Sequence, residues 1–578
     1  MKLAAFNNKE KGQKLMKKFL AAFLCAAVAL SLSACNDNTE TPDDDKDKSS
    51  VSDSKKDNDN STDESKDNSS EGENNSEENS SGEEEAPSNP AEKEEDYVVP
   101  TVGIWDILPE IDETPESELV YSADAELGGV AVTNYTGASP KLRIPDTLGG
   151  QPVVKVDLSA CDYKFTEVIM PETTKEFAFS SISMQTIEYM NFPGAIEKIS
   201  RDDFKPSNAL YIGEGVKEFE AYAFEGVRLA TVNIPNSVKT IGTRAFYDSG
   251  ISSITIGSGV ESIGDGAFRE SRIQSIIIPG NVKTIGDNAF YRCYYLQSVA
   301  LKKGVQSVGY MAFAQCQMLA EIEITGTLTD IGDYAFSDTY WLDMQRATNG
   351  PLVIVNNSLV NGQAYTDAEL TIPKNVTQIC GGAFNSCSGL TKVVIPEGVK
   401  EINRDAFAGC YNLSDVTIPK SVTQIGRNAF EGTPWLEDQR KDSFIIVVND
   451  ILIDGKNASG TITIPSNVTK IADGAFNSAG IKNVTLPDGI TYIGDMAFAY
   501  CGGLQSINIP NTVKYIGGQA FRECGLPSVD IPDSVTYFGA DVFYGCYYLK
   551  TVTYKGNNYY DMNELAALVN GNPALSSG

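Results

Sequence analysis

Apolar and polar positions follow a fixed order that recurs along most of this chain. In residues 232–234 two apolar side chains flank a polar one, the period of two that is typical of a short strand with one buried face. Pro235 has no N–H, so it ends the strand and turns the chain. Val238 and Ile241 come next, and Phe246 ends an Ala-Phe pair that again points inward. The pattern predicts a short strand, a turn and a second inward-facing stretch.

The repeat is defined by its phenylalanine, which recurs every 22 or 23 residues except at two places where the spacing is 48 and 46. Weaker copies begin at Pro145, Pro171, Pro193 and Gly213, and since the last of these contains Phe224 the total is 16 units. The position eleven residues before each phenylalanine is usually proline. The phenylalanines are Phe224, Phe246, Phe268, Phe290, Phe313, Phe336, Phe384, Phe407, Phe430, Phe476, Phe498, Phe521 and Phe543.

The free energy of one unit shows how the units assemble. Six buried apolar side chains contribute roughly 9–18 kcal/mol. Ordering 22 residues costs at least as much, at about 1–2 kcal/mol for each residue. A single unit therefore cannot fold, whereas stacked units cover one another's apolar faces. The sequence predicts a mainly β repeat solenoid of about 16 coils with short parallel strands.

The motif that runs from Ile509-Pro510 to Cys524 resembles the BspA-type leucine-rich repeat of bacterial surface proteins. The resemblance covers about 420 residues in many copies. It implies a parallel β solenoid, exposure at the cell surface and, for some members, adhesion to host proteins or to other cells. It does not identify a ligand, because such scaffolds carry recognition in variable exposed positions.

The two long spacings contain insertions built on one plan. Each begins with Thr-x-Trp-Leu, which places Trp341 and Trp435 at the same offset from their phenylalanines. Two short apolar runs follow around Asn356-Asn357 and Asn449-Asp450, residue types that tolerate the backbone of tight hairpins. We expect two hairpins laid against the solenoid. Each tryptophan either pins its hairpin or contacts a ligand where the repeat is broken.

Composition excludes several classes of function. The chain has 46 Lys and Arg against 78 Asp and Glu, a net charge of −32, which disfavours binding to nucleic acid. It has no histidine, so the usual general base and the commonest metal ligand are missing. We therefore predict no enzyme, no metal site and no cofactor.

The N-terminus predicts a lipid anchor. Residues 1–35 form a lipoprotein signal peptide, in which a lysine-rich start leads into an apolar run too short to span a membrane. The run ends in Leu-Ser-Ala-Cys, which resembles the lipobox of bacterial lipoproteins and makes Cys35 the site of lipid attachment. Residues 36–96 hold 23 Asp and Glu and six Lys, so we expect a disordered acidic linker. The protein would then be lipid-anchored at the cell envelope, on the outer face of a bacterial membrane.

The remaining chain divides into three parts. Residues 97–140 are expected to form an N-terminal cap region, residues 141–554 the leucine-rich repeat solenoid, and residues 555–578 a C-terminal cap and tail. Seven of the eleven cysteines lie three residues after a repeat phenylalanine. Stacking would bring neighbours within disulfide range, but small buried thiols that pack in the core are the simpler interpretation.

Exposed aromatic residues are the candidates for ligand contact. Tyrosines cluster beside the repeat cysteines, and tyrosine anchors interfaces with proteins and sugars well. Packing between coils is the alternative role for them. We predict a surface-anchored recognition protein that binds an extracellular protein or glycan, and the alternative is a structural envelope spacer without a specific ligand. The candidate ligand-binding residues are Trp341, Trp435, Tyr294, Tyr295, Tyr547 and Tyr548.

Overall fold

The computed structural model describes residues 104–201, 206–326, 328–562 and 565. The predicted signal peptide, the predicted acidic linker and Cys35, the predicted site of lipid attachment, lie outside these residues. Within the described part, no helix is both long enough and apolar enough to cross a membrane.

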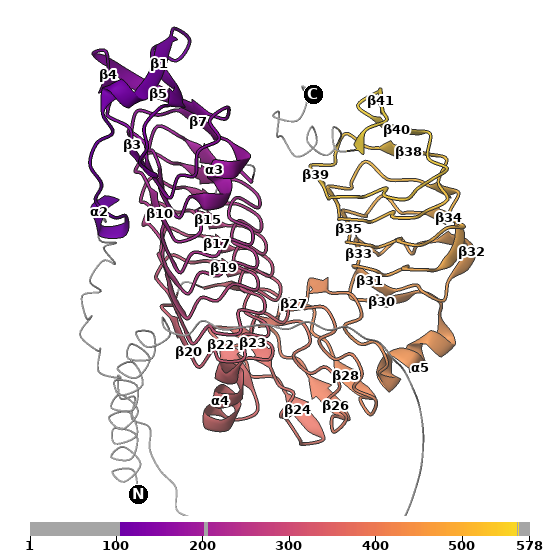
Figure 1. Ribbon diagram of the computed structural model, residues 1–578. Coiled ribbons are helices and arrows are strands. Elements are labelled where there is room, and N and C mark those ends of the chain that lie inside the picture. Colours follow the sequence, from indigo (N-terminus) through magenta and orange to yellow (C-terminus); the bar gives the residue numbers. More distant parts are fainter. Residues whose placement is uncertain (1–103, 202–205, 327, 563–564, 566–578) are drawn as a thin grey trace, which may run out of the picture. The chain divides into compact units, whose positions relative to one another are not determined.

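Most coils of the solenoid contribute two short strands, and most of these strands pair in parallel with their equivalents in the next coil (Figure 1). The strand before the proline position forms the first-strand row, and the strand that ends at the repeat isoleucine forms the second-strand row. In β12 and β14, for example, Val232 lies beside Ile254. In β13 and β15, Ile241 lies beside Ile263. The predicted solenoid is confirmed, with about 18 turns where 16 were expected.

The first segment, residues 141–338, contains the longest stack of coils. Its first-strand row consists of β3 (Lys141–Arg143), β6 (Glu167–Ile169), β8 (Tyr189–Phe192), β10 (Ala209–Ile212), β12 (Thr231–Asn233), β14 (Ser253–Thr255), β16 (Ser275–Ile278), β18 (Ser298–Leu301) and β20 (Glu321–Ile324). Its second-strand row consists of β9 (Lys198–Ile199), β11 (Glu218–Phe219), β13 (Thr240–Ile241), β15 (Ser262–Ile263), β17 (Thr284–Ile285), β19 (Ser307–Val308) and β21 (Asp330–Ile331).

The second and third segments, residues 351–432 and 444–559, repeat this plan. The second contains β22 (Val353–Val355), β23 (Ser358–Asn361), β24 (Glu369–Thr371), β25 (Gln378–Ile379), β26 (Lys392–Val394), β27 (Glu401–Ile402), β28 (Asp415–Thr417) and β29 (Gln424–Ile425). The third contains β30 (Ile446–Val448), β31 (Ile451–Asp454), β32 (Ser459–Thr463), β33 (Lys470–Ile471), β34 (Gly480–Thr485), β35 (Tyr492–Ile493), β36 (Ser506–Ile507), β37 (Tyr515–Ile516), β38 (Ser528–Ile531), β39 (Tyr537–Phe538), β40 (Thr551–Tyr554) and β41 (Asn557–Tyr559).

The ends of the stack carry antiparallel strands. At the N-terminal end β1 (Leu119–Asp124) pairs with β2 (Gly129–Tyr135), and β5 (Gln151–Leu158) joins them with β4 (Thr147–Leu148) and β7 (Glu176–Phe179). At the other end β41 folds back on β40. The short helices here are α2 (Ile104–Ile107), the 3-10 turn η1 (Glu116–Glu118) and α3 (Ser181–Thr186).

The two insertions are hairpins, as expected, but they do not lie against an unbroken solenoid. β22 pairs with β23 in antiparallel orientation, and β23 continues in parallel into β25. β30, β31 and β33 repeat this arrangement. Each hairpin therefore starts a new second-strand row and occupies a place in the stack, which raises the number of turns above the number of sequence repeats.

Each hairpin is preceded by a helix that the sequence analysis did not predict. These helices are α4 (Tyr340–Asn349), which lies beside β22 and β23 in Figure 1, and α5 (Pro434–Asp442). Thr339 caps α4, and its hydroxyl accepts a hydrogen bond from the Leu342 N–H at 3.2 Å. Thr433 caps α5 in the same way. Pro434 at the first helical position adds a second start signal to α5.

The core is a row of stacked phenylalanine rings, which we call the Phe ladder. Phe290 and Phe313 have ring centroids 5.0 Å apart, and Phe384 and Phe407 have centroids 5.1 Å apart. These four side chains are fully buried. Because the rings repeat at nearly the strand spacing, one residue type fills the centre of each coil that carries an Ala-Phe pair.

Candidate ligand-binding surface

The turn around each Ala-Phe pair forms a third column of hydrogen bonds between coils. The Phe246 N–H donates to the Ala267 carbonyl at 2.6 Å, and the Phe268 N–H donates to the Ala289 carbonyl at 2.7 Å. The second residue after the phenylalanine has a positive φ in most coils, as at Asp248 and Glu270. The backbone of the turn is therefore fixed by stacking, and the side chains that point away from the core are free to vary. We call this outer face the turn surface.

The repeat cysteines belong to the inner side of the same turns. The nine described cysteines are buried free thiols. The Cys410 Sγ donates to the Phe384 carbonyl at 3.1 Å, and Cys524 makes the same contact with Phe498. Burial raises the pKa of Cys410 to about 12. These thiols satisfy a carbonyl of the preceding coil, which supports the packing role over a reactive one.

Four predicted ligand-binding tyrosines lie on the turn surface. The exposed fractions are 42% for Tyr294, 51% for Tyr295, 91% for Tyr547 and 71% for Tyr548. Tyr294 and Tyr295 follow Phe290 in the first segment, whereas Tyr547 and Tyr548 follow Phe543 in the third. The structure therefore exposes all four side chains, but in two separate patches.

The two predicted tryptophans lie at the ends of the Phe ladder. Trp341 is only 6% exposed, and its ring centroid is 5.2 Å from that of Phe336. Trp435 is half-buried and lies 4.7 Å from Phe430. Each indole covers the last phenylalanine of its segment. This placement favours the packing role, and ligand contact by the tryptophans stays a prediction.

The turn surface of the first segment also carries an alternating stack of arginine and tyrosine side chains. Arg269 lies between Tyr247 and Tyr291, with 5.7 Å and 5.1 Å from its guanidinium carbon to the two ring centroids. Distances of this size allow cation–π attraction. The sequence analysis missed this feature because its members occupy different positions in successive units. The stack runs Arg201, Tyr222, Arg244, Tyr247, Arg269, Tyr291 and Arg292.

A second aromatic row lies on the outer side of the second-strand row in the third segment. Tyr492, Tyr515 and Tyr537 are parallel, with centroids 4.5 Å and 4.4 Å apart. Asp473 lies beside Tyr492. Burial and the nearby Asp495 carboxylate raise the pKa of Asp473 to about 6. This row of rings could have been recognised from the sequence, because a tyrosine precedes the repeat isoleucine or phenylalanine in three successive units.

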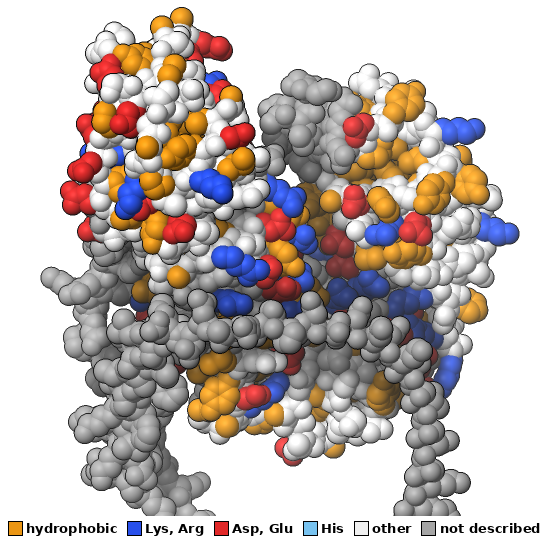
Figure 2. Space-filling view, viewed as in Figure 1, with side chains coloured by type: hydrophobic (Ala, Val, Ile, Leu, Met, Phe, Trp, Pro, Cys, Tyr) orange, Lys and Arg blue, Asp and Glu red, His pale blue; other side chains and the backbone are white. Residues whose placement is uncertain are grey.

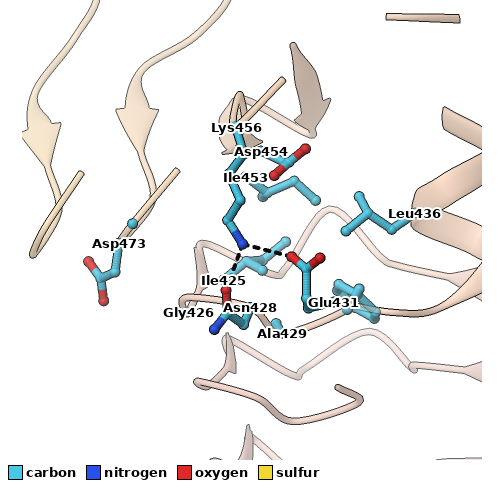
Figure 3. Close-up of a pocket in the computed structure, with 12 residues that line it drawn as sticks. Ile425, Gly426, Asn428, Ala429, Glu431, Leu436, Ile453, Asp454, Lys456 and Asp473 are labelled. Carbon is cyan, nitrogen blue, oxygen red and sulfur yellow. Dashed lines mark hydrogen bonds and ion pairs between the residues drawn. The ribbon is translucent and has the colours of Figure 1, made fainter. Parts of the chain in front are cut away.

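A small pocket at the second hairpin is filled by charged side chains (Figure 3). The Lys456 ammonium donates to Asn428 and to Glu431, each at 2.7 Å. Arg440 pairs with Glu431 and with the buried Asp454. Burial by itself would raise the pKa of Glu431. The hydrogen bonds from Arg440 and Lys456 have the larger combined effect, so the pKa is lowered to about 2.

The free volume of this pocket is about 10 Å³, which has room for one water molecule at most. The first hairpin has a counterpart with fewer charges, in which Arg346 donates to Asn361 and Gln363 and pairs with Asp343. Both networks join a helix to its hairpin, so we assign them a structural role. Within the described ranges, no group of three or more His, Cys, Asp or Glu side chains could hold a metal ion.

Charged side chains of both signs are mixed on the face that Figure 2 shows, with no large area of a single sign. On this face, charge of one sign is therefore concentrated only in local clusters. The arginine and tyrosine stack is a cluster of this kind. The turn surface is therefore the candidate ligand-binding surface, with Tyr294 and Tyr295 in the first segment and Tyr547 and Tyr548 in the third.

Comparison with known proteins agrees with this architecture. The model of the BspA type leucine rich repeat region matches residues 217–343, 365–479 and 443–550, with six copies, which together make up more than half of the chain. None of the curated proteins matches this chain.

Three solved structures are similar to the chain. A leucine rich cell surface protein from Faecalibacterium prausnitzii A2-165 is 22% identical over 69% of this chain and 94% of that chain, with a TM-score of 0.28. A leucine-rich repeat protein from Bacteroides ovatus ATCC 8483 is 20% identical over 77% and 93%, with a TM-score of 0.32. The pneumococcal vaccine antigen PcpA is 16% identical over 75% and 94%, with a TM-score of 0.28.

Proposed function

This chain belongs to the BspA-type leucine-rich repeat family, and from that premise we propose that it is a bacterial cell-surface protein that binds an extracellular protein or glycan and catalyses no reaction. The family supplies the fold and the expectation of surface exposure. The ligand contacts would be made by the turn surface, because the repeat apolar side chains of each coil are buried in the core and cannot reach a ligand.

The observation that carries the proposal is the contrast between the two sides of one turn. Phe543 and Cys546 are at most 9% exposed, whereas Tyr547 and Tyr548 are among the most exposed large side chains of the described chain. A tyrosine that is 91% exposed contributes little to the stability of the solenoid. Exposed tyrosine is, however, common at the centre of protein and sugar interfaces.

Attachment to the membrane is the second part of the proposal. Lipid on Cys35 would hold the protein at the outer face of the membrane, and the acidic linker would separate the solenoid from the bilayer. We expect Cys35→Ala to release the protein from membranes. Fractionation of cells that express the wild type and the variant tests this, with the periplasmic or secreted pool as readout. A variant that stays in the membrane pellet at wild-type levels would show that the anchor is elsewhere.

Ligand binding is tested with the full chain carrying Cys35→Ala, applied to a glycan array and to a panel of immobilised extracellular matrix proteins. We expect the wild-type turn surface to bind at least one probe. The pair Tyr547→Ser and Tyr548→Ser, or the pair Tyr294→Ser and Tyr295→Ser, should weaken that binding at least tenfold. Thr255→Ala on the first-strand row is the control. A chain that binds no probe would favour a structural spacer. Binding that survives both pairs of substitutions would place recognition away from these four tyrosines.

A further inference from the structure

The arginine and tyrosine stack belongs to a basic part of the turn surface. We call the four turns 222–228, 244–250, 266–272 and 288–294 the basic turn surface. They contain five arginines and three carboxylates, so their net charge is 5 − 3 = +2, in a chain whose net charge is −32. Four equivalent turns of the third segment, 474–480, 496–502, 519–525 and 541–547, contain one arginine and two carboxylates, for 1 − 2 = −1. The fold therefore does not require these arginines.

Stacking on tyrosine orients Arg244 and engages only one of its donors, since Nη1 donates to the Tyr222 hydroxyl at 3.3 Å. The Arg244 guanidinium lies 5.7 Å from the Tyr222 ring centroid and 5.9 Å from the Tyr247 ring centroid. A guanidinium that is stacked between two rings keeps its in-plane N–H groups at the open edge. That edge has the geometry to bind a carboxylate or a sulfate through two parallel hydrogen bonds.

Three arginines of this surface have no carboxylate partner among the residues that the structure describes. Arg228, Arg244 and Arg272 are exposed, and the hydrogen bond from Arg244 goes to the Tyr222 hydroxyl. By contrast, Arg269 and Arg292 share the Glu270 carboxylate. The surface thus presents three cations in three successive coils that no acid of the described chain neutralises.

Aromatic side chains continue this surface at one end. Arg272 and Tyr294 both stand four residues after their repeat phenylalanines, in adjacent coils. Equivalent positions of adjacent coils are about 5 Å apart. Tyr294 and Tyr295 are both exposed. The basic turn surface therefore combines anion donors with aromatic rings that suit the apolar faces of sugars.

We propose that the basic turn surface binds an acidic polysaccharide through its carboxylate or sulfate groups. The inference rests on the proposed function and names the class of ligand for it. The three exposed arginines, one in each of three successive coils, match a linear polymer with anionic groups at intervals. At physiological salt the screening length is about 8 Å, so the remote acidic residues of the chain repel such a ligand weakly.

The test measures binding of the full chain carrying Cys35→Ala to immobilised chondroitin sulfate and hyaluronan, with dextran as the neutral polymer. Wild type should bind at least one acidic polymer and should not bind dextran. The substitutions Arg228→Gln, Arg244→Gln and Arg272→Gln, combined, should weaken binding at least tenfold. Raising the salt concentration should weaken the wild type more than the triple variant. Preference for chondroitin sulfate over hyaluronan would assign the contact to sulfate, and equal binding would assign it to carboxylate.

Matched variants separate binding from folding. Arg522→Gln is the control, because Arg522 also stacks between two tyrosines, Tyr500 and Tyr544, but on a turn surface that is not basic. It should leave binding unchanged. The pair Arg228→Glu and Arg272→Glu lies outside the ring contacts, so it should abolish binding without a change in melting temperature. Replacing the three exposed arginines with lysine should restore part of the affinity, because charge returns without the planar fork.

Three results would overturn the inference. One is a triple variant that binds the acidic polymers as tightly as wild type. Another is equal binding of wild type to dextran. The third is stronger binding to polyglutamate than to either acidic polysaccharide, which would assign the surface to an acidic protein. None of these results decides the proposed function itself, which is tested separately by the tyrosine pairs on the protein and glycan panels.

Discussion

At the scale of single residues, the repeat assigns each position either to the core or to the surface. The buried positions could be predicted because a phenylalanine every 22 or 23 residues can only be satisfied by stacking. Phe246, Phe407 and Phe521 are fully buried, as expected. The stack of Arg244 and Tyr247 could not be predicted, because its members occupy different positions in successive units.

The carboxylate of Asp473 should make stability depend on pH. It accepts the Asp495 N–H at 3.0 Å, and its pKa is raised from 3.8 to about 6, mainly by burial. A raised pKa in the folded state means that the folded chain holds the proton more tightly. The protonated Asp473 side chain therefore contributes its full stabilisation of the folded state below pH 4. This contribution is lost as the pH rises through 6.

We expect Asp473→Asn to remove this dependence, since the amide resembles the protonated acid. Between pH 7 and pH 4 the wild type should gain on the order of 1–3 kcal/mol of unfolding free energy relative to the variant. Urea unfolding at a series of pH values measures the difference. Parallel curves for the two proteins across this range would show that the carboxylate titrates normally.

At the scale of elements, the hairpins show where sequence reasoning stopped. Their strands could be predicted from two apolar runs around Asn356-Asn357, and the structure confirms them. Their place in the stack could not be predicted, because it depends on Gly362, which occupies the position of a repeat phenylalanine. The Gly362 N–H donates to the Ala383 carbonyl, as the N–H of a repeat phenylalanine does in other coils. The helix α4 was missed because only Trp341 and Leu342 of its 10 residues are buried, which leaves no helical apolar period to recognise.

Gly362→Ala tests this placement. A Cβ atom at residue 362 would clash with the ring of Phe384, so the first rung of the second segment would have to move. We expect a loss of about 1–3 kcal/mol in the unfolding free energy, typical of overpacking in a core. Gly502→Ala is the matched control, because the nearest atom to its Cβ would be 4.0 Å away. Equal stability of the two variants would show that Gly362 does not stand in for a phenylalanine.

At the scale of the whole molecule, the proposed function assigns stability and recognition to different parts of the solenoid. Stability is carried by contacts between neighbouring coils, in a Phe ladder whose first two segments each end at a tryptophan. Recognition is assigned to the turn surface, where side chains change from coil to coil without disturbing the core. This division explains why the fold could be predicted from one motif while the ligand class had to be inferred from local charge and exposure.

The most direct test of this account is hydrogen exchange of the wild type and of Phe407→Ala. Phe407 is fully buried between Phe384 and Phe430, with ring centroids at 5.1 Å and 5.4 Å, so the substitution should cost about 3–5 kcal/mol. In a stack stabilised by neighbouring coils, faster exchange should be greatest in the coil of residue 407 and decline through the coils on either side. Exchange that accelerates equally in every coil from residue 141 to residue 554 would contradict the account.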